Sequence, residues 1–228
     1  MINWLLDWLF PIRCSGCGRY DTWLCTACQV RDCVPIQQPG VSAAALYQTE
    51  SIQQLIHHLK YRGYRSVNHC LSQILYQSIN WDEVDVVVPI PLHWRKRLTR
   101  GYNQTELLVR DWPAAIVPAL KKIKSTRSQA KLNKPERQKN LHGAFAIDPH
   151  YQSLIHGKRV LLIDDVYSTG STTAACTEVL LGAGVASVAV AVVALNVPSC
   201  GIEPQLQDPQ SCVLSVERRG RISPDILL

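Results

Sequence analysis

The segment VLLIDDVYSTGSTT at residues 160–173 constrains the fold of this chain more than any other. Four apolar residues end in Asp164 and Asp165, and a short loop of Ser, Thr and Gly then opens into TTAACTEVLLGAG, which reads as a helix. The run VASVAVAVVAL follows at 185–195 as another strand. Short, continuously apolar runs are typical of parallel strands buried on both faces. The pattern therefore predicts a strand, helix, strand unit within a parallel α/β sheet.

The loop between this strand and this helix has the chemistry of a phosphate site. Its residues are Ser168, Thr169, Gly170, Ser171 and Thr172. Their N–H groups and hydroxyls, with the dipole of the following helix, favour an anion. The two aspartates lie at the sheet edge where ligands bind in such folds, and they can accept hydrogen bonds from sugar hydroxyls. A Walker loop and a Rossmann fingerprint are both excluded, because neither glycine pattern is present. The alternative is a pair of aspartates that cap a helix before a solvated turn.

The remaining sequence supplies further elements for such a sheet. Further strands are expected at 42–48, 84–91 and 119–124. Helices are expected at 67–75, at 104–112 and in SIQQLIHHLKYRG, with Ser51 as its N-cap and Gly63 as its stop. HWRKRLTRGYNQ at 93–104 is interpreted as the loop after the strand at 84–91. The long stretch at 125–143 lacks a clear period and is interpreted as a second loop.

A chain of 228 residues can form one well-buried domain and a short accessory module. The loop-like run PIQQPG at 35–40 follows the cysteine pairs, so we divide the chain into 1–40, 41–197 and an unassigned extension at 198–228. The first ten residues lack a basic n-region and a cleavage site. No run reaches the roughly 20 apolar residues of a membrane span. We therefore expect a cytoplasmic protein without membrane insertion.

Four of the nine cysteines have the spacing of a metal site. Cys14, Cys17, Cys25 and Cys28 form C-x₂-C-x₇-C-x₂-C, which can close a tetrahedral thiolate site around Zn²⁺. Such closed four-cysteine sites are structural. Redox chemistry and reduced structural thiols are the alternatives. Cys33 is a spare, and the others are interpreted as small buried hydrophobes or unpaired thiols.

Basic residues are concentrated in one central segment. Residues 93–142 hold 13 Lys and Arg against three acidic residues, a net charge of +10 in a chain whose total is +6. Cations at the sheet edge suit a ligand with several phosphates. They could also follow the backbone of single-stranded DNA while an aromatic residue stacks on the bases. A solvated charged surface is the third interpretation.

The whole pattern resembles a known family. VLLIDDVYSTGSTT is similar to the signature of type I phosphoribosyltransferases, which bind 5-phosphoribosyl-1-pyrophosphate (PRPP). The cysteine module, LIHHLKYRG, VVPIPLHWRKRLTRGYNQ, RSQAKLNKPERQKNLHGAF and the signature, in this order, resemble the ComF/GntX family, which is associated with DNA uptake and competence. The resemblance covers about residues 1–195. It implies a parallel-sheet, phosphoribosyltransferase-like α/β domain behind a small zinc-ribbon module.

The resemblance also implies roles for individual residues. Asp164 and Asp165 would hold the ribose hydroxyls, and the 168–172 loop would hold the 5-phosphate. Pro91, Leu92 and His93 would occupy the position of the pyrophosphate loop, with Mg²⁺ accompanying PRPP. The 125–143 segment corresponds to the flexible loop that folds over the substrate in related enzymes. Tyr167 departs from the signature, which favours an aliphatic residue there.

Two functions follow as hypotheses. In the first, the protein handles single-stranded DNA during natural transformation, and its phosphoribosyl site recognises a nucleotide moiety. A competence helicase is then a candidate partner. The nucleic-acid contacts would come from Trp94, Arg95, Lys96, Arg97, Arg100 and Tyr102. In the second, it is an active phosphoribosyltransferase that makes or salvages a nucleotide from PRPP and a base.

Overall fold

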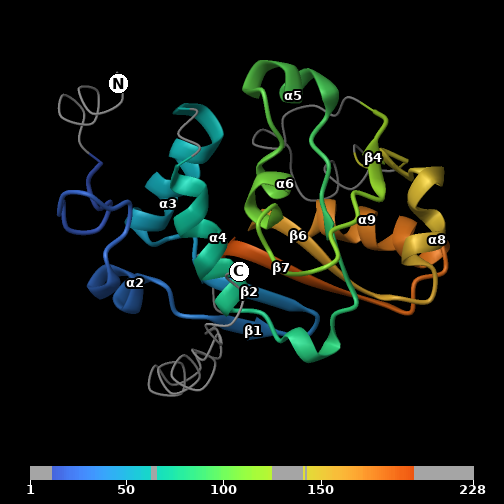
Figure 1. Cartoon of the computed structure of the whole chain (residues 1–228), viewed down its shortest axis with the longest axis horizontal. Helices are drawn as coiled ribbons and strands as arrows, with labels where there is room; N and C mark the ends of the chain where they lie inside the picture. Colours follow the sequence, from blue (N-terminus) through green and yellow to red (C-terminus); the bar gives the residue numbers. More distant parts are fainter. Residues whose placement is uncertain (1–11, 63–65, 125–140, 142, 198–228) are drawn as a thin grey trace, which may run out of the picture.

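The computed structural model describes residues 12–62, 66–124, 141 and 143–197, which form a sheet with helices on both faces (Figure 1). The strands of the main sheet lie in the order β1-β2-β7-β6-β3. They comprise β1 (Ile36–Gln38), β2 (Val41–Leu46), β7 (Ser187–Leu195), β6 (Arg159–Tyr167) and β3 (Val86–Pro89). Among the described strands of this sheet, the edge pair of β1 with β2 is antiparallel, and the other three pairings are parallel. The predicted parallel α/β sheet is therefore confirmed.

The connecting helices and a second small sheet complete the described fold. The helices are α2 (Thr26–Asp32), α3 (Glu50–His57), α4 (Val67–Gln77), α5 (Trp94–Arg100), α6 (Gln104–Val109), α8 (Gln152–Ile155) and α9 (Ser171–Gly182). Shorter turns are a π-helical turn at His58–Arg62 and 3₁₀ turns at Trp81–Glu83 and Pro149–Tyr151. The strands β4 (Leu120–Lys122) and β5 (Phe145–Ile147) pair antiparallel, apart from the main sheet.

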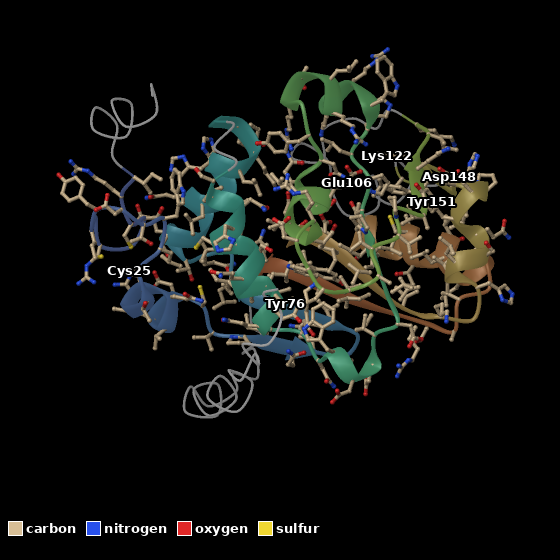
Figure 2. All side chains as sticks on the ribbon, in the orientation of Figure 1. Cys25, Tyr76, Glu106, Lys122, Asp148 and Tyr151 are labelled. Carbon is tan, nitrogen blue, oxygen red and sulfur yellow. The ribbon has the colours of Figure 1, made fainter. Side chains whose placement is uncertain are left out.

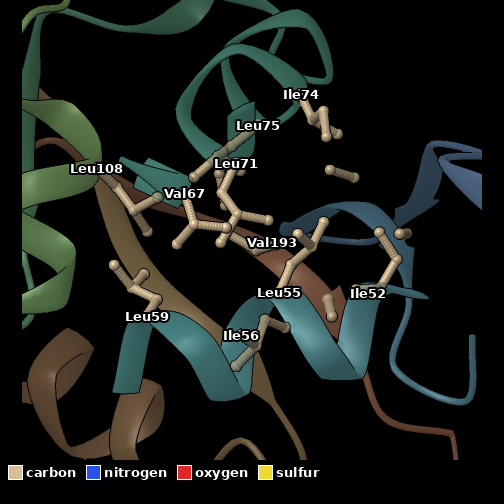
Figure 3. Packing of buried hydrophobic residues seen from close by; sticks show 14 of the residues in the cluster. Ile52, Leu55, Ile56, Leu59, Val67, Leu71, Ile74, Leu75, Leu108 and Val193 are labelled. Carbon is tan, nitrogen blue, oxygen red and sulfur yellow. The ribbon is translucent and has the colours of Figure 1, made fainter. Parts of the chain in front are cut away.

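Alternation along β6 explains the two layers of helices. Leu161 and Ile163 belong to the core shared with α3, α4 and α6, whereas Val160 and Leu162 belong to the core shared with α8 and α9. Successive side chains of a strand point to opposite faces, so a strand with apolar residues at every position must be covered on both sides. Figure 3 shows the first core, in which the apolar side chains of α3 and α4 pack over Val193 of β7.

The cysteine-rich start packs directly against the main domain. Cys14, Leu24, Cys25 and Cys28 are buried in the same apolar cluster as α3 and α4. The hydroxyl of Ser51 donates a 2.6 Å hydrogen bond to the Asp32 carboxylate. The expectation that Ser51 caps its helix is therefore wrong, because α3 begins at Glu50 after the N-cap Thr49.

The structure corrects two segments interpreted as loops. PIQQPG contains β1, whose residues pair with β2 at the edge of the main sheet. HWRKRLTRGYNQ contains the helix α5. The long 125–143 segment lies outside the described residues except for 141 and 143, as does Gly63. Within the described part of the chain, no helix is both long and apolar enough to cross a membrane.

Candidate functional site

A cavity of about 440 Å³ lies at the carboxyl ends of β3 and β6. Its wall includes both aspartates of the signature, all five residues of the 168–172 loop, and Pro91 and Leu92. These segments are distant in sequence but meet because parallel strands present their carboxyl ends at one edge of the sheet. Three segments were expected to bind a phosphoribosyl ligand: the two aspartates, the 168–172 loop and residues 91–93. The first two line this cavity completely, and the third lines it through Pro91 and Leu92.

The 168–172 loop depends on the conformation of Gly170. Gly170 has a φ of +70° and is the N-cap of α9. A Cβ atom there would lie only 2.3 Å from the Tyr167 hydroxyl. The side-chain oxygens of Thr169 and Ser171 are 2.9 Å apart, and Thr173 donates to the Gly170 carbonyl oxygen. The loop is thus a compact turn at the start of a 12-residue helix, and Tyr167, the departure from the signature, packs over its glycine.

The two aspartates have different surroundings. The backbone N–H of Asp165 donates a 2.8 Å hydrogen bond to Asp164 Oδ1, and Asp165 Oδ1 lies 2.7 Å from Lys60 Nζ. Burial, followed by the neighbouring charge of Asp165, raises the pKa of Asp164 to about 7. Burial alone would lower the pKa of Lys60, but the attraction of Asp165 outweighs it and the pKa is raised. Asp165 is therefore held in an ion pair, while Asp164 can exchange a proton near neutral pH.

Four cations surround the same cavity and repel one another. Lys60, Lys96, Arg100 and Lys122 all line it. Burial and the charges of Arg100 and Lys60 lower the pKa of Lys96. Burial and the charge of Lys96 lower the pKa of Lys122. Like charges gathered in a partly desolvated cavity favour an anionic ligand, because such a ligand relieves the repulsion.

His93 does not line the cavity, unlike Pro91 and Leu92. It is buried as the N-cap of α5, where its Nδ1 accepts a 3.4 Å hydrogen bond from the N–H of Arg95. Burial, and then the charges of Lys122 and Arg95, lower its pKa. This position gives His93 a role in starting α5.

The helix α5 divides its cations between two surroundings. Lys96 and Arg100, four residues apart, line the cavity. Trp94 is 56% exposed and carries the Arg95 guanidinium 5.3 Å from its ring centre. Arg97 pairs with Glu106 of α6 at 3.2 Å (Glu106 is labelled in Figure 2). Trp94 and Arg95 are thus accessible from solvent on this helix.

Tyr102 lies in a different setting from Trp94. It is partly buried, and its hydroxyl donates a hydrogen bond to the Leu59 carbonyl oxygen. The exposed aromatic residue at the cavity is Tyr61, which is 67% exposed and has the Arg100 guanidinium 5.2 Å from its ring centre.

Sequence reasoning missed several residues of this cavity. Lys60 and Tyr61 come from a segment interpreted only as a helix, and Lys122 was considered only as one of many cations in the basic segment. Asn103, Gln104 and Thr105 also line the cavity. The signal that could have identified the last group is the polar run Tyr-Asn-Gln-Thr directly after the strand and its basic segment.

The four cysteines of the predicted metal site meet in the structure. Their sulfur atoms all lie within 4.8 Å of one another, and Cys17 Sγ is 3.6 Å from Cys25 Sγ (Cys25 is labelled in Figure 2). Tetrahedral Zn–S bonds of about 2.3 Å place sulfurs about 3.8 Å apart. Burial raises the pKa of Cys14, but the N–H groups of Cys25 and Gly16 outweigh it and lower the pKa to about 6. The cluster could hold a metal ion such as zinc.

Gly16 allows this cluster to close. A Cβ atom at Gly16 would lie 2.7 Å from Cys28 Sγ. Cys176 is fully buried, and Cys33 and Cys70 are partly buried. Cys200 and Cys212 lie outside the described residues.

Comparison with known protein families identifies the family of the domain that contains this cavity. The model of the phosphoribosyl transferase domain matches residues 57–213. The chain belongs to this family. The matched range of this phosphoribosyl transferase domain begins in α3 and contains both aspartates and the 168–172 loop.

Relatives place this phosphoribosyl transferase domain protein in the ComF family. It is 27% identical to Competence protein F of Haemophilus influenzae over an alignment of 195 residues. This alignment covers 79% of this chain and 83% of the relative. It is 28% identical over 215 residues to DNA utilization protein YhgH of Salmonella typhimurium, covering 82% and 90%. It is 26% identical over 184 residues to Competence protein ComFC of Bacillus subtilis, covering 76% and 73%.

Proposed function

We propose that this ComF-family protein acts in the uptake or use of DNA, binding a phosphoribosyl ligand in its cavity and single-stranded DNA beside it. The observation that carries the proposal is the cavity itself, which combines two carboxylates, a phosphate-binding type of loop and four cations. The names of the relatives, two competence proteins and a DNA utilization protein, support the process.

The chemistry of the cavity fits PRPP or a nucleotide. Asp164 and Asp165 would accept hydrogen bonds from the ribose hydroxyls, and the 168–172 loop would receive the 5-phosphate at the start of α9. The four cations offset the charge of a diphosphate. Mg²⁺ binds through one or two carboxylates and substrate phosphates, so Asp164 or Asp165 would share it with the ligand.

A zinc ion would serve the fold rather than the ligand. The four thiolates of Cys14, Cys17, Cys25 and Cys28 form a closed set, which leaves no open position for a substrate. The bonding of Asp32 to Ser51 connects this module to α3. We therefore propose that the change of function, from metal binding to ligand binding, falls before β1, which already belongs to the main sheet, and that both parts share one core.

Single-stranded DNA would lie along the exposed side of α5. Trp94 offers a ring for base stacking, and Arg95 and Arg97 offer charges to the backbone. Tyr61 at the cavity provides a second exposed ring and is a better stacking candidate than Tyr102, whose hydroxyl is engaged by Leu59. The charge of residues 93–142 suits a polyanion of this kind.

The ligand-binding part is tested with the double substitution Asp164→Asn and Asp165→Asn. Neutral amides offer the sugar hydroxyls about half the acceptor capacity of carboxylates, so PRPP with Mg²⁺ should no longer bind in isothermal calorimetry. The control is Asp85→Asn, which removes a carboxylate next to Arg159 at the amino end of β3, whereas the cavity lies at the carboxyl end. Unchanged PRPP affinity in the double variant would reject the site.

The second candidate is an active phosphoribosyltransferase, favoured by the same intact cavity. Displacement at the anomeric carbon needs stabilisation of the leaving diphosphate and exclusion of water more than a strong base. Incubation with PRPP, Mg²⁺ and a panel of nucleobases separates the candidates, because an enzyme releases pyrophosphate with some acceptor and a binding protein does not.

A further inference from the structure

Lys60 is a cation whose charged end lies in the wall of the cavity. Its Nζ atom is 2.7 Å from Asp165 Oδ1, and the two side chains are only 21% and 15% exposed. Both residues line the cavity. Lys96 lines it too, but among the described residues the Asp165 carboxylate pairs with Lys60 and not with Lys96. The ion pair is therefore a specific contact of one cation with one of the two aspartates.

The backbone before Lys60 has an uncommon conformation. The π-helical turn at His58–Arg62 follows α3 directly. Leu59 is fully buried in the core that contains α3 and α4, and its carbonyl oxygen accepts a hydrogen bond from the Tyr102 hydroxyl. Single π-helical turns are rare and occur frequently at functional sites. Packing and this hydrogen bond thus fix the peptide unit from which Lys60 extends toward Asp165.

The ion pair covers a carboxylate that a divalent cation could otherwise bind. Asp164 Oδ1 already accepts the N–H of Asp165 at 2.8 Å, and Asp165 Oδ1 holds Lys60. Mg²⁺ binds carboxylate oxygens at about 2.0–2.1 Å. A metal ion on Asp165 would therefore lie next to the Lys60 ammonium, where like charges repel strongly. A lone divalent cation must displace Lys60 or bind beside it against this repulsion.

A phosphorylated ligand changes this balance. Mg²⁺ usually binds through one or two carboxylates together with substrate phosphates. The negative charge of such phosphates offsets the charge of Lys60 and that of the metal ion at the same time. The repulsion that acts on a lone metal ion is therefore reduced for a metal ion that arrives with its ligand.

We propose that Lys60 is a built-in counter-ion of Asp165 that excludes a lone divalent cation from the two aspartates, so that Mg²⁺ enters the cavity with its ligand. The entry of the metal with a ligand rests on the proposed phosphoribosyl site. The exclusion of a lone metal ion concerns the free protein and is measured without any ligand. Lys60 is thus a positioning residue, which acts through Asp165.

The test measures Mn²⁺ binding to the whole protein in the absence of PRPP. Mn²⁺ prefers the same oxygen ligands as Mg²⁺, and its free form is followed by electron paramagnetic resonance. Lys60→Met removes the charge that covers Asp165. We expect the affinity of this variant for Mn²⁺ to exceed that of the wild type by at least about 10-fold. Lys60→Gln, which keeps a hydrogen-bond donor for Asp165 but no charge, should show a gain in the same direction.

Three controls separate this role from a general effect of charge. Lys96→Met removes one positive charge from the same cavity without uncovering Asp165, so its gain should be several-fold smaller. Lys60→Arg keeps the charge and should bind Mn²⁺ as weakly as the wild type. In the double variant Lys60→Met with Asp165→Asn, the gain should disappear, because the carboxylate that Lys60 covers has been removed.

Each result bears on one claim. If Lys60→Met and Lys60→Gln bind Mn²⁺ no more tightly than the wild type, the counter-ion role is wrong. An equal gain in Lys96→Met would also overturn it, since only the total charge would then matter. If Lys60→Met gains affinity for Mn²⁺ but the wild type does not bind PRPP with Mg²⁺, the counter-ion role stands and the proposed phosphoribosyl site fails.

Discussion

Asp164 carries an ionisation that couples the site to the stability of the fold. Its pKa is raised from 3.8 to about 7 by burial and by Asp165. The folded protein therefore binds a proton that the unfolded chain releases above pH 4. Between these two pKa values, stability falls as pH rises, by about 1.4 kcal/mol per pH unit for one proton. A carboxylate kept for binding is thus a source of instability at neutral pH.

We predict that Asp164→Asn removes this pH dependence. At pH 5, Asp164 in the folded state is mostly protonated and resembles Asn, whereas at pH 8 the wild type has lost the proton-linked part of its stability and the variant has not. The free energy of unfolding, measured with urea at both values, should therefore fall less between pH 5 and pH 8 in the variant. An equal fall in both proteins would mean that Asp164 titrates normally.

Sequence patterns could point to candidate residues of the cavity where those residues lie close together in the sequence. The adjacent aspartates and the following Ser, Thr and Gly residues could be identified because one strand and one turn carry them all. Lys60 could not, since its 2.7 Å contact with Asp165 joins residues 105 positions apart. The π-helical turn at His58–Arg62 orients Lys60, and the apolar period of the helix before it gives no sign of such a turn.

Among the elements, α5 is the clearest failure of sequence reasoning, and the reason is physical. None of its seven residues joins an apolar core, so it has no apolar period to detect. Its ends are nevertheless defined, by the His93 side chain at the N-cap and by Gly101 at the C-cap with a φ of +76°. A glycine after two basic residues in the last turn is a recognised stop signal. Termini, rather than periodicity, could have predicted this helix.

The cations and the exposed tryptophan of α5 lead to a prediction about DNA. For single-stranded DNA, the logarithm of the binding constant falls linearly with the logarithm of the salt concentration. Replacing Arg95, Lys96 and Arg97 by Ala should reduce the magnitude of this slope by up to roughly two, at about 0.7 per lost phosphate contact. Trp94→Ala should instead weaken binding at every salt concentration, by on the order of 1 to 3 kcal/mol. Fluorescence anisotropy against salt distinguishes the two effects.

The control for this experiment is Arg110→Ala. Arg110 is an exposed arginine beyond the end of α6 that pairs with Asp111, so its loss removes one charge away from α5. It should leave the salt slope nearly unchanged. If heparin competes as well as DNA and Trp94→Ala has no effect, α5 does not form a specific surface for single-stranded DNA.

For the whole molecule, the sequence predicts the kind of sheet but not its order. Strands β6 and β7 with α9 between them could be identified, because three consecutive segments carry the signal. The position of β7 between β2 and β6 depends on pairings between residues more than 140 positions apart, such as Val41 with Val190. Local periodicity contains no information on such partners. The same limit hid β1, whose three residues only pair at an edge.

The cysteine module leads to a prediction about metal. We expect one zinc per chain by elemental analysis, and Cys14→Ser or Cys25→Ser should abolish it. Metal binding contributes the folding free energy of such small modules, so amide hydrogen exchange in residues 12–33 should accelerate strongly in either variant. Cys70→Ser, a change on α4 outside the cluster, should leave the zinc content unchanged. Zinc-free wild-type protein, purified without chelator, would contradict the assignment.

Contacts between the cysteine module and α3 connect the cysteine cluster with the cavity, two sites that share no residue. The module touches α3 at its start, through Asp32 and Ser51, and reaches the turn beyond its end, where the Trp23 ring lies 5.4 Å from that of His58. Lys60 follows two residues after His58 and forms an ion pair with Asp165. Because free energy is a function of state, any factor by which the metal raises the affinity for PRPP equals the factor by which PRPP raises the affinity for the metal. Under the proposed function, the two affinities would then rise or fall together.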